Sequence, residues 1–383
     1  MNVQIWRYTM KNLSDVLTEE EKATLKLRTL YQGYGYSQFN MSKFEEYDLY
    51  VRNKDFLASD NVITFTDTNG KLMALKPDVT LSIIKNSKDT DDSLQKLYYI
   101  ENIYRVSKET HTYKEILQTG LECIGKIDCY HMSEVIMLAC KSLQSISNSY
   151  LLDISHMGII TVLIEELNLS SHEKKLILKY IGERNLDGIK KACDAHSGNK
   201  AICKVLITVL SSYGPMDTVI PVLTELCING TMKLYIKELE EIFEILKENH
   251  LKNIQLDFSI VNGMNYYSGI VFQGFISGIP SAFLSGGRYD KLMQKMGKGS
   301  GAIGFAVYLD LIQHLSPPPK AYDVDALLLY DENSDPKQLT KAVQEWNGTG
   351  QSIQVQPTVP KGLKYKKLLQ IKDGRLEIVD SDD

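Results

Sequence analysis

The sequence has 383 residues, of which 43% are hydrophobic and 24% are charged, and its formal net charge is −5. This composition is typical of a globular protein with room for two or three domains. The mild negative charge argues against bulk electrostatic binding of nucleic acid. No apolar run is long enough to span a membrane, and the N-terminal segment lacks the apolar core of a signal peptide.

The six cysteines contain no C-x-x-C pair, and the seven histidines show no H-E-x-x-H spacing. We therefore expect neither a disulfide framework nor a metal site, and we expect no cofactor. This use of cysteine fits a reducing compartment, so the sequence predicts a cytoplasmic protein.

The first predicted elements are a helix and a β-hairpin. The segment T-E-E-E at residues 18–21 matches a capping box, which predicts a helix to about Tyr31 with Gly33 past its end. Two alternating strands flank Asn69-Gly70, the residue pair preferred in type I′ turns. A short helix is predicted to begin at Pro77.

The middle of the chain predicts strands on either side of a long helical block. Strands are predicted at 96–106, 115–125 and 150–156, an amphipathic helix at 131–143, helices from about Met157 to His250, strands at 254–260, 266–275 and 281–287, and a closing helix at 301–315. Pro317 to Pro319 mark a stiff linker. After it come a strand at 326–330, a helix at 336–346, a strand at 352–356 and a hairpin at Asp373-Gly374.

This order of elements predicts an α+β fold. Hairpins outnumber β-helix-β units, so the sheet should be mainly antiparallel and flanked by helices. We expect a core at residues 1–316 with a helical insertion at about 157–250, followed by a small C-terminal α/β segment at 320–383.

Several polar residues are candidates for a binding site. The carboxylate of Asp78 and the hydroxyl of Thr80 are suited to an ammonium group, although helix capping explains Asp78 equally well. Gln118 and Glu122 lie four apart in a predicted strand and so share one face. A glutamate among apolar neighbours needs a partner, which a bound cation, an imidazole or a structural arginine such as Arg288 would supply.

Two further features involve aromatic and basic residues. Tyr266 and Tyr267 are adjacent in a predicted strand, so one ring should enter the core and the other should line the opposite face. Aromatic packing alone explains the pair unless the second ring lines a pocket. Arg105 lies at the end of a strand, and two glycines before Arg288 suggest a tight bend with close backbone approach.

In combination, these segments resemble the catalytic core of the class II aminoacyl-tRNA synthetases, specifically the histidyl branch, over roughly residues 10 to 315. L-K-P-D-V-T (75–80) resembles the family's L-R-P-[ED]-x-T, and the strands that hold Arg105 and Glu122 resemble its motif 2. V-N-G-M-N-Y-Y-S-G-I-V-F (261–272) resembles the histidine-specific R-G-x-x-Y-Y-[TS]-G-x-x-F. G-G-R-Y-D-K-L-M and G-A-I-G-F-A-V-Y-L-D-L-I resemble motif 3.

The chain departs from the synthetase pattern where arginines are expected. Asn262 occupies the first position of the histidine motif, and Leu311 occupies the motif 3 position whose arginine contacts ATP in the family. Arg105 and Arg288 are retained. Adenylate formation gathers negative charge on a phosphate, and loss of one stabilising donor typically costs about 10²–10³ in rate. The resemblance therefore implies that ligase activity is lost and that no catalytic residue remains.

With these departures the chain resembles the family of ATP phosphoribosyltransferase regulatory subunits, which are synthetase-like proteins without ligase activity. The resemblance implies a short-form catalytic subunit as partner, a homodimer through the N-terminal helix and following strand, and feedback control by L-histidine. It implies a histidine pocket formed by Asp78, Thr80, Gln118, Glu122, Tyr266 and Tyr267.

Two other functions are consistent with the sequence. One is a divergent histidine–tRNA ligase. The other is a synthetase-like histidine sensor or tRNA-binding module with another partner. Residues 320–383 contain nine lysines and arginines against eleven aspartates and glutamates. An RNA-reading surface should be basic, so a nucleic-acid partner is not expected.

Overall fold

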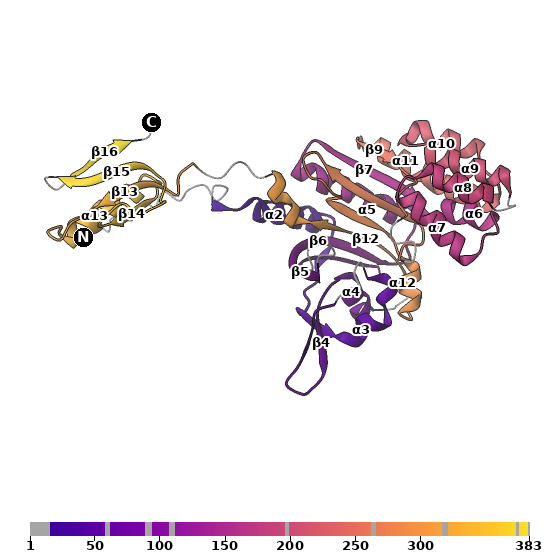
Figure 1. Cartoon of the computed structure of the whole chain (residues 1–383), viewed down its shortest axis with the longest axis horizontal. Helices are drawn as coiled ribbons and strands as arrows, with labels where there is room; N and C mark the ends of the chain where they lie inside the picture. Colours follow the sequence, from indigo (N-terminus) through magenta and orange to yellow (C-terminus); the bar gives the residue numbers. More distant parts are fainter. Residues whose placement is uncertain are drawn as a thin grey trace. The chain divides into compact units, whose positions relative to one another are not determined.

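The computed structural model describes residues 16–57, 62–88, 94–106, 112–195, 199–261, 266–315, 321–372 and 375–381. These residues form two compact units. One runs from Glu19 to Leu315, and the other contains residues 16–18 and the described part of the chain after 316 (Figure 1). Within the described residues, no helix combines the length and the apolar character needed to span a membrane.

The larger unit is built on a nine-stranded sheet with the order β1-β5-β6-β12-β11-β10-β7-β9-β8. All neighbours are antiparallel except the pairs β1–β5 and β7–β9. The strands are β1 (Ser37–Gln38), β5 (Gln95–Val106), β6 (Tyr113–Gly125), β7 (Tyr150–His156), β8 (Gly214–Pro215), β9 (Ile254–Leu256), β10 (Ile270–Ile276), β11 (Leu284–Arg288) and β12 (Gly301–Tyr308). The predicted α+β fold with a mainly antiparallel sheet is confirmed.

Two long helices pack with this sheet in the main hydrophobic core. They are α2 (Glu19–Gly33) and α5 (Cys129–Ile146), and the hydroxyls of Tyr31 and Ser142 lie 3.1 Å apart between them. Helix α2 extends slightly beyond the predicted end. Gly33, which was predicted to follow the helix, is its last residue. The glycine with left-handed backbone geometry after the helix is Gly35, with φ of 80°.

A bundle of helices is inserted between β7 and β9. It contains α6 (Met157–Glu166), α7 (Ser171–Gly182), α8 (Leu186–Ala195), α9 (Lys200–Ser211), α10 (Met216–Glu225) and α11 (Gly230–Glu248), which lie together in Figure 1. Side-chain caps at Ser170, Asn199 and Asn229 start three of these helices by accepting hydrogen bonds from free backbone N–H groups. The predicted helical stretch is therefore present, with only the short strand β8 inside it.

A disulfide joins Cys193 of α8 to Cys203 of α9, so the prediction of a chain without disulfides is wrong. The two residues are ten apart in sequence. The search for closely spaced cysteines missed them because the approach depends on how two consecutive helices fold against each other. Cys123, Cys129, Cys140 and Cys227 are free.

The predicted hairpin is present in a separate three-stranded sheet of order β2-β4-β3, but its turn is not type I′. The strands are β2 (Phe44–Glu46), β3 (Thr64–Thr66) and β4 (Leu72–Leu75). A type I′ turn needs positive φ at both central residues, yet only Gly70, at 80°, has it in this turn. The Asp67 carboxylate accepts hydrogen bonds from the backbone N–H groups of Asn69 and Lys71, which holds the longer turn instead.

The predicted closing helix at 301–315 is wrong. Its first half is strand β12, which pairs with β6 on one side and with β11 on the other. Its second half is a 3-10 helix, η2 (Leu309–Leu315). A continuous apolar run does not by itself distinguish a buried strand from a buried helix. Here two neighbouring strands satisfy the backbone, so the strand is formed.

The remaining short helices of this unit are α3 (Tyr47–Arg52), η1 (Lys54–Phe56), α4 (Thr80–Asn86) and α12 (Asp290–Lys295). The C-terminal unit has the sheet order β14-β13-β15-β16, with β13 (Val324–Leu329), β14 (Ile353–Gln356), β15 (Tyr365–Lys372), β16 (Arg375–Ser381) and helix α13 (Pro336–Asn347). Ala326, Leu328, Ala342 and Leu369 form its own small core. The tail elements are as predicted. The proline linker at 317–319 and the turn at 373–374 lie outside the described residues.

Candidate functional site

The larger unit contains a cavity of about 750 Å³ above the central strands of the sheet. It is lined by seven of the residues singled out in the sequence, namely Asp78, Thr80, Arg105, Gln118, Glu122, Tyr266 and Tyr267. These residues come from segments up to about 190 positions apart, and the sheet order β5-β6-β12-β11 brings them together.

The floor of the cavity is set by the register of β6 and β12. Gln118 lies opposite Tyr308, and Glu122 lies opposite Gly304. Successive side chains of a strand point to opposite faces of the sheet, so residues four apart share a face. Gln118 and Glu122 both line the cavity, as their spacing predicts. The missing side chain of Gly304 leaves the space that Glu122 occupies. A Cβ atom at this position would lie 1.8 Å from Oε2 of Glu122.

Glu122 is buried, with 2% of its surface exposed, and two hydroxyl groups hold it. Thr80 donates a hydrogen bond of 2.8 Å to Oε1, and Tyr289 donates one of 2.6 Å to Oε2. Arg288, which was considered as a structural partner, is bound to Asp290 instead. Burial raises the pKa of Glu122 to about 8, although both hydrogen bonds oppose the shift.

This pKa predicts a pH dependence of stability that belongs to Glu122. The folded-state pKa lies above the unfolded value of 4.5, so the stabilisation is complete below pH 4.5 and is lost as the pH rises through 8. We expect the free energy of unfolding to fall by roughly 2 kcal/mol between pH 6 and pH 8 from this group alone. Chemical denaturation of Glu122→Gln at several pH values should show this component removed.

The control for this measurement is Glu115→Gln, which removes an exposed carboxylate from the same strand. Burial also raises the pKa of Asp153, to about 6. Because Asp153 is present in every variant, its contribution to the pH dependence of stability cancels in the comparison. If the difference between wild type and Glu122→Gln does not change with pH, the high pKa assigned to Glu122 is wrong.

Asp78 lies at the start of α4, which begins at Thr80 rather than at Pro77 as predicted. Asp78 directly precedes the N-cap residue Val79, and its carboxylate accepts a hydrogen bond of 2.9 Å from the backbone N–H of Leu81 in the first turn. Burial raises the pKa of Asp78, while this bond and the Arg105 guanidinium act in the opposite direction. Asp78 therefore both caps the helix and lines the cavity. Arg105 Nε donates to the backbone oxygen of Pro77 at 3.0 Å.

The two adjacent tyrosines do not alternate across a strand, so that prediction is wrong. Strand β10 begins only at Ile270, and both rings precede it and line the same cavity. Their centroids lie 4.8 Å apart in an edge-to-face arrangement. The absence of a side chain at Gly287 leaves room for the Tyr267 ring, since a Cβ atom there would lie 2.7 Å from that ring. Burial raises the pKa of both phenols.

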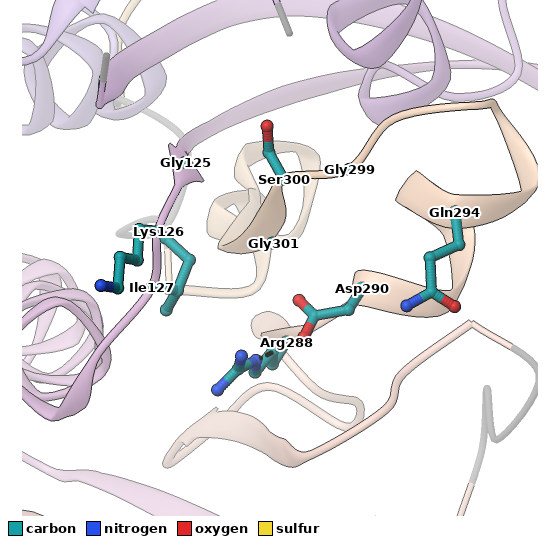
Figure 2. Close-up of a pocket in the computed structure, with 9 residues that line it drawn as sticks. All are labelled: Gly125, Lys126, Ile127, Arg288, Asp290, Gln294, Gly299, Ser300 and Gly301. Carbon is teal, nitrogen blue, oxygen red and sulfur yellow. Dashed lines mark hydrogen bonds and ion pairs between the residues drawn. The ribbon is translucent and has the colours of Figure 1, made fainter. Parts of the chain in front are cut away.

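Arg288 lies at a different cavity of about 500 Å³, which Lys126, Gln294 and Ser300 also line (Figure 2). Its Nε is 2.8 Å from Oδ2 of Asp290, next to which it lies in Figure 2. The predicted bend before Arg288 is absent because Gly286 and Gly287 are inside β11. The predicted close approach is present, since a Cβ at Gly286 would lie 2.4 Å from the backbone oxygen of Gly304.

The two positions that depart from the synthetase pattern are Leu311 and Asn262. Leu311 lies in η2 and packs against the main hydrophobic core, and it is not among the described residues that line the larger cavity. Asn262 lies outside the described residues.

The sequence analysis missed several residues that line the cavity. Tyr99, Ser285, Tyr289 and Tyr308 come from the sheet and from the start of α12, and Lys175, Leu178 and Lys179 come from helix α7 of the insertion. Of these residues, Tyr289 has the clearest signal in the sequence, because it directly follows Arg288 in the motif 3 segment. The lysines have helical spacing of four, but nothing in the sequence relates them to this sheet.

The chain is similar to known proteins in sequence and in fold. The family model described as histidyl-tRNA synthetase matches residues 12–312. An "ATP phosphoribosyltransferase regulatory subunit" from Oceanobacillus iheyensis is 28% identical over 367 residues, which cover 93% of this chain and 89% of the relative.

Two solved structures have a similar fold. An "ATP phosphoribosyltransferase regulatory subunit/histidyl-tRNA synthetase" from Bacillus halodurans has a TM-score of 0.76 at 20% identity, covering 97% of this chain and 99% of its own. A chain of the "ATP phosphoribosyl transferase (HisG:HisZ) complex" from Thermotoga maritima has a TM-score of 0.60 at 16% identity, with coverages of 75% and 96%. Because the family model spans most of the chain, this protein belongs to the histidyl-tRNA synthetase family.

Proposed function

We propose that this chain is a non-catalytic regulatory subunit of ATP phosphoribosyltransferase. It is required for the activity of a short-form catalytic subunit and for feedback control by histidine at the first step of histidine biosynthesis. The observation that carries the proposal is that the cavity keeps one half of the synthetase site and not the other. The acidic and aromatic residues of the histidine side line the cavity, whereas Leu311, at the motif 3 arginine position, packs against the main hydrophobic core. The similarity to a relative named for this role supports it.

The proposed ligand of the cavity is L-histidine. Asp78 and Thr80 hold the α-ammonium with help from Gln118. Glu122 accepts a hydrogen bond from an imidazole nitrogen. Tyr266 and Tyr267 contribute a ring face and a hydroxyl. Each of these roles uses a side chain that lines the cavity.

Further parts of the proposal concern organisation. The core at 1–316 and the segment at 320–383 act as separate domains, and the chain forms a homodimer through α2 and the strand after it. Light scattering of the pure chain would measure the dimer.

The protein has no ligase activity and works in the cytoplasm, where the disulfide between Cys193 and Cys203 would be exposed to reduction. Labelling of free thiols in protein taken directly from cells would show its state.

The test is reconstitution with a short-form catalytic subunit from the same genome. We expect the mixture to form a complex in gel filtration, to gain phosphoribosyltransferase activity and to lose it when histidine is added. Glu122→Ala should keep the activation but shift inhibition to about ten- to a hundredfold higher histidine, because it removes the hydrogen bond to the imidazole and leaves a buried donor without a partner. If no complex forms and no activity appears, the proposed function is wrong.

A second candidate is a divergent histidine–tRNA ligase. It is favoured by Arg105, the motif 2 arginine, which is retained and lines the cavity. Histidine-dependent exchange of pyrophosphate into ATP separates the two functions. Exchange at the rate of an ordinary synthetase would favour the ligase, and its absence together with activation of the transferase would reject it.

A further inference from the structure

Helix α7 of the insertion reaches the cavity of the core. Lys175, Leu178 and Lys179 line the cavity together with the residues of the sheet. Positions three and four apart on a helix are neighbours on one face, so both lysines face the same way and Leu178 lies beside them. The following inference rests on the proposed function, because it concerns the ligand of the same cavity.

Helix α7 is well anchored where it presents these side chains. Ser170 and Glu173 form a complete capping box at its start. Ile177 and Ile181 are buried in the main core on its other face. Just beyond its end, the Arg184 guanidinium binds the Asp257 carboxylate, which follows β9. The lysines are thus carried by a helix fixed to the edge of the sheet.

The charges of the cavity lining are divided between the core and the insertion. Among the described lining residues, the carboxylates Asp55, Asp78 and Glu122 all come from the core. Among the described lining residues of the core, the one cation is Arg105, whose Nε is bound to the Pro77 oxygen. The other two cations are Lys175 and Lys179. An amino acid that places its ammonium at Asp78 and its ring at Glu122 has a carboxylate left to pair.

Both lysines are available for such a contact. Lys175 is exposed and, within the part of the chain that the structure describes, makes no ion pair or hydrogen bond. Lys179 lies 3.8 Å from Glu183, and the two side chains are 66% and 51% exposed. A surface pair of this kind contributes little stability, so it is readily exchanged for a ligand.

We propose that Lys175 and Lys179 hold the α-carboxylate of the bound amino acid, in place of the arginine that this chain lacks at position 262. Val261, the last described residue before that position, also lines the cavity. The ligand then joins the insertion to the core, since its ammonium and ring bind one and its carboxylate binds the other. Any effect of histidine on a partner that contacts the insertion is reciprocal, so the partner changes the affinity for histidine by the same factor.

The test compares L-histidine with histamine, which has the same ring and ammonium but no carboxylate. Calorimetry is done on the full chain and on the double variant Lys175→Gln/Lys179→Gln. We expect the Kd for L-histidine to rise about tenfold or more and the Kd for histamine to stay unchanged. The matched control is Lys174→Gln, which removes the same charge from the same helix at a residue that does not line the cavity.

Each outcome decides a different question. An unchanged Kd for L-histidine in the double variant overturns the carboxylate contact and leaves the proposed function intact. Equal losses for both ligands also overturn it, because the carboxylate would then not be what the lysines recognise. No heat with wild type and either ligand contradicts the histidine site of the proposed function itself.

Discussion

Replacing Gly304 with alanine is expected to unfold or severely destabilise the larger unit. The new Cβ atom would lie 1.8 Å from Oε2 of Glu122 and 2.3 Å from the backbone oxygen of Leu121. The Glu122 side chain is itself held by Thr80 and Tyr289, and a backbone atom in the middle of a sheet cannot move aside. Overpacking of this kind costs about 3 kcal/mol, at the upper end of the usual range. Denaturant unfolding measures the loss, and histidine binding should disappear with it.

The control is Gly33→Ala in the last turn of α2. Apart from its chain neighbours and the adjacent backbone of α2, no atom of the described residues lies within 4 Å of the added Cβ, and Gly33 has helical geometry. Alanine there should change the free energy of unfolding by less than about 1 kcal/mol, in the stabilising direction. If Gly304→Ala is as stable as this control, the close packing of β12 against Glu122 is wrong.

The second large effect is expected from Glu101→Ala. Lys76 is fully buried, and its Nζ lies 2.5 Å from Oε2 of Glu101, a side chain that is 16% exposed. Removing one partner of a buried ion pair leaves an uncompensated charge and typically costs about 3–5 kcal/mol. The pair joins β5 to the segment that holds Asp78 and Thr80, so histidine affinity should fall as well. Denaturant unfolding and calorimetry measure the two effects.

Two further variants separate the charge from the packing. Asp48→Ala breaks an exposed pair, whose side chains are 79% and 73% accessible, and should cost less than about 1 kcal/mol. Lys76→Met/Glu101→Leu removes both charges and should recover most of the stability lost in Glu101→Ala. A loss in the double variant as large as that in Glu101→Ala would show that the charge is not the cause.

Elements with strong local signals were predictable from the sequence. Strands β5 and β6, which hold Arg105 and Glu122, were predicted close to their observed bounds, and so were helix α13 and the strands of the tail. Strand β12 was not predictable, because Ala302, Ile303 and Phe305 are buried on both faces of the sheet. Such a run has no alternation, and only pairing with β6 and β11 makes it a strand.

The candidate site was predictable where the residues follow a recognisable order in the chain. Asp78, Gln118 and Glu122 were found in this way and share one cavity. Gly304 was missed because its position opposite Glu122 depends on strand register, which no local pattern reports. The α7 lysines depend on how a separate bundle of helices packs on the sheet, and that is decided by tertiary contacts alone.

The parallel pairing of β7 with β9 constrains the order in which the chain can assemble. Leu152 pairs with Ile254, roughly one hundred residues later, so closing this loop costs conformational entropy before any strand contact is gained. Because the compact helices α6 to α11 shorten the effective loop, we expect the insertion to form early and the pairing of β7 with β9 to form late. Until β9 pairs with it, that edge of β7 would be open to other chains, so we expect newly made protein to be most prone to aggregate in that interval.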